Sequence, residues 1–275
     1  MPNYKQKAKE VRIKVLDLIF NAQTSHIGSC FSAIDIMAVL FEKADPQKDE
    51  VVLSAGWKAA AWYYFLQQKG IISEEELNSF CQEGSKFIGL VEPIDNRWGL
   101  RIGGGSMGLG LPAAVGIALA KKIKKEEGNV YVLMSDGELQ CGTTWESALI
   151  ATQHKLNNLI VFVDNNGLQA MGEIDKILSL ESIMDKFISF GWKVLGGDGH
   201  DFDVLENVWK VDWENPYSTD GIGIKEHGYI KGKPLLMICD TIKGKGVSFM
   251  ENNNLYHYKA PSREEYEEAL KELNG

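Results

Sequence analysis

Two short polar segments of the sequence could together hold a metal ion. Residues 130–134 are an apolar run that ends in Ser-Asp-Gly-Glu, and residues 159–163 are a second apolar run that ends in Asp-Asn-Asn. If the two runs are neighbouring strands of a parallel sheet, Asp136 and Asn166 lie side by side, because the carboxyl ends of such strands border one crevice. About thirty residues separate Asp136 from Asn166, a length that suits one strand–helix–strand crossover.

The metal that fits these side chains is Mg2+. Asp136 offers a carboxylate oxygen, Asn166 an amide oxygen and Leu168 a backbone carbonyl. Mg2+ prefers an octahedron of oxygen ligands and is commonly bound by one or two protein groups together with substrate phosphates. Gly137 would let the backbone approach such a phosphate closely. The same residue types also dominate ordinary turns, so these two segments alone leave open both a metal site and a pair of structural turns.

The elements that must position these residues indicate an α/β fold. Residues 144–154, between the two apolar runs, have a helical pattern, so this region reads strand, helix, strand. Upstream, the glycine-rich residues 103–110 lead into an Ala-rich stretch, 112–120, that is typical of a buried helix. The glycines would let the backbone approach an anionic ligand at the helix N-terminus, or would serve only close helix–sheet packing. We predict a doubly wound α/β fold with a mostly parallel sheet flanked by helices, in a single domain over residues 1–275.

Two local expectations depend on single segments. Ser32 is expected to cap the helix that follows it, with Asp35 in its first turn. Residues 212–233, with one proline and four glycines, are expected to form a long loop at a subunit contact or over the site. The other predicted elements are strands at 51–54, 191–195 and 235–240, and helices at 4–22, at 59–82 as a pair, at 201–209 and after 262.

Several motifs, in one order, resemble those of the N-terminal half of transketolase, and most of all the split form in which that half is a separate polypeptide. They are SHIGSCFSAIDIMAVL near the start, GGGSMGLGLPAAVGIALA, the Asp-Gly and Asn of the thiamine-diphosphate motif, GELQCGTTWESAL, and KGKGVSFMENN with HYKAP near the end. A series of motifs is more specific than one motif. The resemblance implies a thiamine-diphosphate-binding fold, thiamine diphosphate and Mg2+ as cofactors, and transfer of a two-carbon ketol unit from a ketose to an aldehyde acceptor.

The resemblance also implies roles for individual residues. His26 matches a histidine of the family's substrate channel, close to the reactive carbon of the cofactor, and His257 matches the last site histidine loosely. The metal would be held by Asp136, Asn166 and the carbonyl of Leu168. The residues that would contact the cofactor are Gly105, Ser106, Met107, Asp136, Gly137, Glu138, Asn166 and Leu168.

Four positions depart from the family pattern. Trp57 stands where the family has a histidine that contacts cofactor phosphate and substrate, and an indole is a hydrogen-bond donor only. Leu90 lies near the place of a second substrate-channel histidine, so both changes leave sugar-phosphate specificity in question. Ser135 replaces the first glycine of the metal motif, and Cys141 replaces an acid that accompanies Glu146 in the family. Glu146 itself fits either a dimer interface or an ordinary helix surface.

Composition narrows the class of protein. The net charge of −9 argues against a nucleic-acid-binding surface. The four cysteines are scattered without CxxC spacing, which predicts reduced thiols in a cytoplasmic protein. No apolar run approaches the roughly 20 residues that span a bilayer, and we expect no cleavable signal and no membrane contact. The resemblance to transketolase implies a small sugar or keto substrate.

A partner chain is expected because one part of the family's active site is missing. In the family, a glutamate on a pyrimidine-binding domain activates the cofactor, and such a domain would need roughly 150 further residues. We therefore expect the partner to be a C-terminal, pyrimidine-domain transketolase subunit, in a two-fold dimer of heterodimers. Two alternatives stay open: a thiamine-dependent acyl or ketol transfer in the biosynthesis of an unusual sugar or secondary metabolite, and a non-catalytic scaffold subunit. The presence of Asp136, Gly137 and Asn166 argues against the scaffold.

Overall fold

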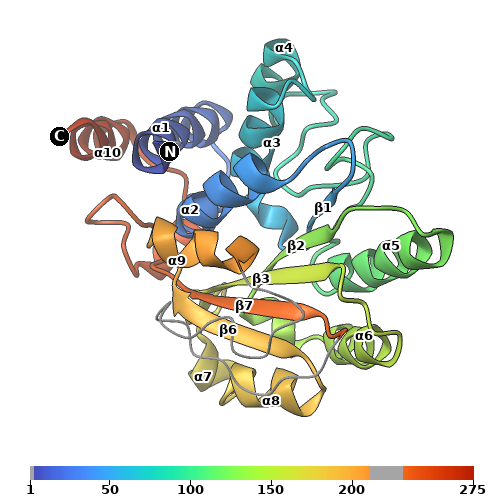
Figure 1. Cartoon of the computed structure of the whole chain (residues 1–275). Helices are drawn as coiled ribbons and strands as arrows, with labels where there is room; N and C mark the ends of the chain where they lie inside the picture. Colours follow the sequence, from blue (N-terminus) through green and yellow to red (C-terminus); the bar gives the residue numbers. More distant parts are fainter. Residues whose placement is uncertain (1–2, 211–231) are drawn as a thin grey trace.

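A five-stranded sheet forms the centre of the computed structural model, which describes residues 3–210 and 232–275 (Figure 1). The strands lie in the order β1-β2-β3-β7-β6, and each neighbouring pair is parallel. Their bounds are β1 Glu50–Leu53, β2 Val130–Ser135, β3 Leu159–Asn165, β6 Lys193–Asp198 and β7 Leu235–Asp240. A separate two-stranded antiparallel ribbon consists of β4 Leu168–Gln169 and β5 Gly172–Glu173.

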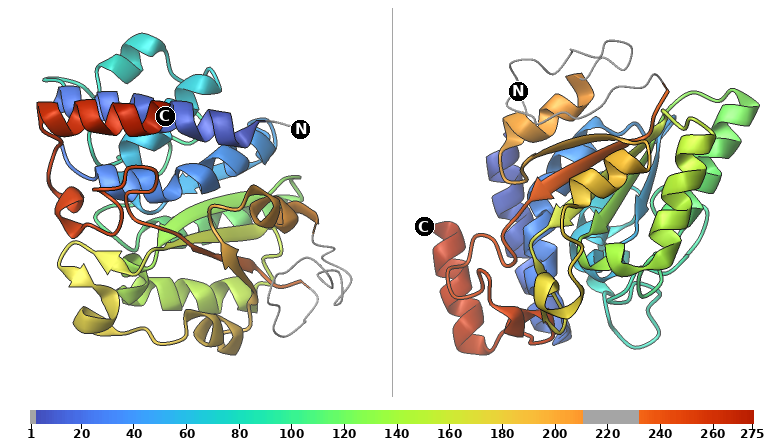
Figure 2. Two further views of the ribbon diagram at one scale, coloured as in Figure 1. Left: turned by 90° about the vertical axis from the view of Figure 1, so that its left-hand side faces the viewer. Right: turned by 90° about the horizontal axis from the view of Figure 1, so that it is seen from below.

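Helices cover both faces of the sheet, which confirms the predicted doubly wound, mostly parallel α/β fold (Figures 1 and 2). One face carries α1 Tyr4–Ala22, α2 Ile27–Lys43, α3 Ala59–Gln68 and α9 Phe202–Asn207. The other face carries α5 Gly110–Lys124, α6 Gly142–Gln153 and α8 Ile183–Ser189. The remaining helices are α4 Glu74–Asn78, α7 Ile174–Leu178 and α10 Arg263–Asn274, the last of which lies beside α1. Short 3-10 helices are η1 Gly56–Lys58, η2 Gly137–Gln140, η3 Val208–Lys210 and η4 Asn254–His257.

The strands are apolar without interruption because both of their faces are buried. In β2, Leu133 packs into the core on the α2 side and Val132 into the core on the α5 side. In β3, Phe162 packs on the α2 side and Val163 on the α5 side, because successive side chains of a strand point to opposite faces. Parallel strands covered by helices on both sides read as continuous apolar runs, and this is the pattern that predicted them.

One local prediction was wrong. Ser32 does not cap a helix, because α2 begins five residues earlier at Ile27 and His26 occupies the N-cap position with a φ of 76°. The Ser32 hydroxyl lies within the helix and bonds Asp164 Oδ2 at 2.6 Å. Asp35 is likewise not a first-turn residue but pairs with Arg12 at 2.6 Å. A buried carboxylate on a distant strand therefore determines the role of this serine, and a capping pattern does not report such a contact.

Most of the expected 212–233 loop lies outside the described residues. In the parts of the chain that the structure describes, every helix is too short or too polar to span a lipid bilayer.

Candidate functional site

A cavity of about 350 Å³ opens at the carboxyl ends of β2 and β3. It combines segments that are far apart in the chain: the start of α2, η1, the glycine-rich loop before α5, the ends of β2 and β3, and η4. Its lining includes most of the predicted site residues, namely His26, Ser106, Met107, Asp136, Gly137, Asn166, Leu168 and His257. A cavity of this size at the carboxyl edge of a parallel sheet is the expected place for a ligand in such a fold.

Asp136 is a buried carboxylate held by backbone groups. Only 2% of its surface is exposed, and its two oxygens accept hydrogen bonds from the N–H of Gly137 at 2.8 Å and of Gly167 at 2.6 Å. Burial and the nearby charge of Asp164 raise the pKa of Asp136 to about 7. Within residues 3–210 and 232–275 no lysine, arginine or histidine forms an ion pair with it. A carboxylate in this condition suits a divalent cation, which would stabilise its ionised form.

The other two predicted metal ligands lie beside Asp136 in the same cavity. Asn166 Oδ1 accepts the N–H of Leu168 at 3.1 Å, and Asn166 Nδ2 donates to Asp164 at 3.4 Å, so neighbours orient the amide. The carbonyl of Leu168 accepts from Lys243 Nζ at 3.4 Å. The described residues contain no group of three His, Cys, Asp or Glu side chains that could hold a metal ion. A metal here would therefore depend on one carboxylate together with amide and carbonyl oxygens, a set that suits Mg2+ bound to a phosphate.

Two buried lysines lie at this end of the sheet, and sequence reasoning missed both. Lys58 Nζ pairs with Asp164 Oδ2 at 2.5 Å and donates to the carbonyl of Ser29 at 3.1 Å. Lys243 is fully buried, and burial followed by the charge of Lys58 lowers its pKa to about 8. For Lys58 the only local signal is a lysine placed within an otherwise apolar stretch, AGWKAAAW.

The two site histidines lie edge to face on one wall of the cavity. Their ring centroids are 5.0 Å apart, and the backbone N–H of His26 donates to the backbone carbonyl of His257 at 2.9 Å. Burial, followed by the charges of Lys58 and Lys243, lowers the pKa of His26 to about 4. Burial, followed by the charge of Lys243, lowers the pKa of His257 to about 3. Both rings are therefore neutral at pH 7 and suited to hydrogen bonding rather than to ion pairing.

Glu138 lies behind the glycine-rich loop and does not line the cavity. It is fully buried and accepts hydrogen bonds from the Ser54 hydroxyl, from the N–H of Gly108 at 3.1 Å and from the N–H of Ser135 at 3.3 Å. Burial raises its pKa to about 7. The side chain thus ties the loop to the ends of β1 and β2.

The loop itself requires glycine where it crosses the strand ends. A Cβ on Gly104 would lie 2.0 Å from the carbonyl oxygen of Ser54, and Gly105 has a φ of +61°. Gly105, like Glu138, lies outside the cavity lining, whereas the next two residues, Ser106 and Met107, belong to it. The glycines therefore position Ser106 and Met107 at the cavity.

The positions that depart from the family pattern fall into two groups. Trp57 and Leu90 both line the cavity, so both stand where a substrate would pass. Ser135 lines the cavity as well, but it is buried, and its hydroxyl accepts from the N–H of Glu138 at 3.4 Å. Cys141 is a half-buried free thiol, and Glu146 is exposed on α6, which leaves open both an interface and an ordinary surface role.

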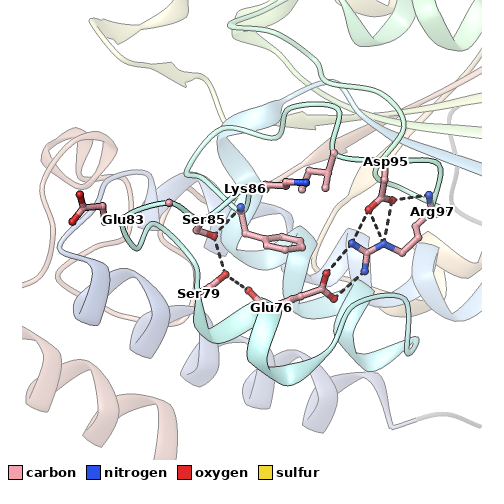
Figure 3. Close-up of a pocket in the computed structure, with 10 residues that line it drawn as sticks. Glu76, Ser79, Glu83, Ser85, Lys86, Asp95 and Arg97 are labelled. Carbon is pink, nitrogen blue, oxygen red and sulfur yellow. Dashed lines mark hydrogen bonds and ion pairs between the residues drawn. The ribbon is translucent and has the colours of Figure 1, made fainter.

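A second hollow, of about 370 Å³, lies between α4 and the segment that follows it (Figure 3). Its guanidinium group, Arg97, is bonded at 2.8 to 3.1 Å to both carboxylate oxygens of Glu76 and of Asp95. Arg97 is already neutralised by these neighbours, and the hollow is separate from the predicted site residues. We assign it no function.

Comparisons with known proteins agree with this geometry. Residues 3–275 match the family described as transketolase, thiamine diphosphate binding domain. The chain is 32% identical to an apulose-4-phosphate transketolase subunit of Phocaeicola vulgatus, over 98% of this chain and 92% of that protein. It is 31% identical to 6-deoxy-6-sulfo-D-fructose transketolase subunit SqwG of Clostridium sp. strain MSTE9, over 97% of this chain and 94% of that protein.

The same relationship holds among solved structures. The crystal structure of transketolase from Campylobacter jejuni matches 98% of this chain with a TM-score of 0.85 and 27% identity, but only 42% of that longer chain is covered. The chain thus spans less than half of a full-length transketolase and nearly the whole of the two separate transketolase subunits. The predicted resemblance to the N-terminal part of a split transketolase is confirmed, and the chain belongs to the transketolase family as its thiamine-diphosphate-binding domain.

Proposed function

We propose that this chain, as one domain over residues 1–275, is the cofactor-binding subunit of a two-chain enzyme that transfers a two-carbon ketol unit from a ketose to an aldehyde. The observation that carries the proposal is the buried carboxylate of Asp136, which lines the same cavity as Asn166 and forms no ion pair with the described side chains. A protein that no longer bound a metal would gain nothing from a buried, unpaired acid. The family to which the chain belongs supports thiamine diphosphate as the cofactor.

The residues present fit thiamine diphosphate with Mg2+. Asp136, Asn166 and the carbonyl of Leu168 would hold the ion and through it the diphosphate, and Lys58 and Lys243 add positive charge nearby. When bound, the cofactor supplies a carbanion that attacks a ketose carbonyl and an electron sink for the bond that breaks.

This chain's part in the reaction is to orient the substrate and to donate hydrogen bonds. His26 and His257 line the cavity as neutral imidazoles, and a neutral imidazole carries one N–H, which can bond a substrate or phosphate oxygen where it faces the cavity. A fixed donor of this kind stabilises charge that develops on oxygen without needing to reorganise.

A partner chain is supported by exposed apolar side chains around the cavity mouth. Met107 and Tyr258 line the cavity yet are 43% and 64% exposed, and Met171 and Leu255, next to lining residues, are 82% and 68% exposed. Large apolar groups gathered at one opening indicate a surface that another protein covers. Relatives of similar length that are named as transketolase subunits imply a second chain in those proteins. We propose that the partner is a pyrimidine-domain subunit, in a two-fold dimer of heterodimers.

Trp57 and Leu90 favour one variation of this function. Both line the cavity where the family has histidines that could bond sugar hydroxyls or phosphates, and neither can accept a hydrogen bond. The second candidate is therefore a thiamine-dependent acyl or ketol transfer to a substrate other than the common sugar phosphates. A panel of donors separates the two: xylulose 5-phosphate, apulose 4-phosphate and 6-deoxy-6-sulfo-D-fructose. Rapid turnover of xylulose 5-phosphate would exclude the variation.

The decisive experiment is native mass spectrometry of the complex isolated from its own source, followed by assays of the chain with and without its partner. We expect a second chain, the added mass of thiamine diphosphate and Mg2+, and turnover only when both chains are present. Turnover of a ketose by this chain alone would contradict the split active site. A complex that stays free of cofactor after both ligands are added would favour a non-catalytic scaffold.

A further inference from the structure

Lys243 contacts one ring nitrogen of His257 from the buried side. The distance from Lys243 Nζ to His257 Nδ1 is 2.9 Å, and the lysine is fully buried while the histidine is 9% exposed. Lys243 Nζ has two further partners, Asn254 Oδ1 at 3.0 Å and the carbonyl of Leu168 at 3.4 Å. The amide of Asn254 is oriented in turn, because its Nδ2 donates to the carbonyl of Ala170 at 3.1 Å.

The three contacts of Lys243 Nζ determine whether the lysine or the histidine donates the hydrogen bond between them. The oxygens of Asn254 and Leu168 carry no hydrogen, so Lys243 must donate to both. An ammonium has three hydrogens and no acceptor site, and the third partner of this one is His257 Nδ1. Three acceptors around three hydrogens leave Nδ1 as an acceptor. A neutral imidazole that accepts at Nδ1 carries its hydrogen on Nε2.

The hydrogen on Nε2 remains available to a ligand. His257 lines the cavity, and none of the described side chains accepts a hydrogen bond from its Nε2. Nε2 is also absent from the buried polar atoms that lack a partner in the described structure, so it keeps some exposed surface. Two charged groups lie around the ring, Lys243 on one side and Lys58 farther off. The neighbouring ring of His26 is neutral.

We propose that Lys243 is a positioning residue that holds His257 as the neutral imidazole with its hydrogen on Nε2, so that a fixed donor faces an oxygen of the substrate or cofactor in the cavity. The tautomer follows from the contacts of this chain, and its use in ketol transfer rests on the proposed function.

His26 supplies an internal contrast. Its Nδ1 lies 2.7 Å from the hydroxyl of Ser25, and a hydroxyl both donates and accepts. The neighbours of His26 therefore do not determine its tautomer, whereas an ammonium determines that of His257.

The test is a long-range 1H–15N correlation spectrum of the full chain, labelled with 15N-histidine and recorded near pH 7 without cofactor or partner. His257→Asn assigns the signals by their loss. We expect a protonated Nε2 and an unprotonated Nδ1 at His257 in the wild type, retention of this pattern in Lys243→Arg, and averaging between tautomers in Lys243→Met. Lys245→Met is the matched control, because Lys245 is a partly exposed lysine two positions away whose side chain pairs with Glu251 at 3.8 Å. A wild-type His257 with its hydrogen on Nδ1 would overturn the proposal whether or not any variant folds.

Assays of the complete two-chain enzyme test the catalytic use of this tautomer. Lys243→Met should lower kcat/KM by about 10- to 100-fold, as the loss of an orienting partner commonly does, and Lys243→Arg should recover much of this loss. Wild-type kcat/KM in Lys243→Met would contradict the positioning role. If the complex binds no thiamine diphosphate at all, the proposed function fails, yet the spectrum of the chain alone still decides the tautomer.

Discussion

Lys58 Nζ lies 2.5 Å from Asp164 Oδ2, and neither side chain has any exposed surface. The pair connects η1 to the end of β3 directly beneath the cavity. Asp164 also accepts from the hydroxyls of Ser32, at 2.6 Å, and Thr241, and Lys58 donates to the carbonyl of Ser29. A buried ion pair is stable only when further hydrogen bonds satisfy both partners, and this one has them.

Removing one member of this ion pair should destabilise the folded chain. We expect Lys58→Met to lower the free energy of unfolding by about 3–5 kcal/mol, because it leaves a buried, uncompensated carboxylate. The double variant Lys58→Met/Asp164→Asn should recover part of this loss, since it removes both charges. Urea denaturation measures both effects. Lys176→Met is the control, because Lys176 pairs with Glu173 on the surface and should cost less than about 1 kcal/mol. A Lys58→Met chain as stable as the wild type would show that the pair contributes nothing.

The metal assignment predicts that Asp136→Asn folds but binds its cofactor weakly. The substitution retains the shape of the side chain and removes a buried charge, but it replaces one oxygen that accepts a backbone N–H with a donor. The free energy of unfolding in the absence of metal should therefore fall by about 1–3 kcal/mol. Affinity for thiamine diphosphate with Mg2+ should fall roughly 100-fold, equivalent to losing about 3 kcal/mol of charge-assisted binding. Titration calorimetry measures this affinity, with the exposed Asp203→Asn as control. EDTA should reduce wild-type binding to the level of the variant, and an EDTA-insensitive wild type would exclude the metal site.

The lowered pKa values of His26 and His257 predict that the folded chain loses stability in mild acid. Their pKa values are about 4 for His26 and about 3 for His257, below the usual 6.5, so the unfolded chain binds more protons as the pH falls below 6.5. Stability contributed by the neutral rings is therefore present above pH 6.5 and declines from there towards pH 4, by roughly 1–2 kcal/mol per histidine at pH 5. The unfolding free energy of the wild type minus that of His26→Asn/His257→Asn, measured between pH 7 and pH 5, should shrink accordingly. A difference that does not vary with pH would mean that both rings titrate normally.

Two glycines close in sequence should respond oppositely to alanine. At Gly104 a Cβ would lie 2.0 Å from the carbonyl oxygen of Ser54, so Gly104→Ala must displace the loop that presents Ser106 and Met107. We expect a stability loss of more than about 2 kcal/mol and weaker cofactor binding. Gly116 is an exposed residue of α5, and a Cβ added there would have no atom within 4 Å, so Gly116→Ala should stabilise by about 0.5–1 kcal/mol. Thermal unfolding compares the two, and a tolerated Gly104→Ala would contradict the close contact.

Local sequence patterns determined most of the fold and the centre of the site. Apolar runs predicted β2, β3 and β7 because parallel strands are buried on both faces. Ser73 and Ser262 cap the starts of α4 and α10, where capping boxes form, and a capping box is a local pattern of the sequence. The positions of Asp136 and Asn166 followed from the same logic, since both come directly after strands that pair in the sheet.

Tertiary structure alone decided the contacts that join distant segments. Lys58 and Asp164 are 106 residues apart, Ser32 and Asp164 are 132 apart, and no local pattern relates them. The placement of β7 beside β3 brings Lys243 into contact with Leu168 and His257, which line the cavity. Glu138 points away from the cavity because its carboxylate accepts hydrogen bonds from Ser54, Gly108 and Ser135. The sequence by itself determined that Asp136 and Asn166 follow two strand ends, because side-chain type and strand period are local properties. The buried charges that tune the site depended on the order of the strands, which is set by packing over the whole chain.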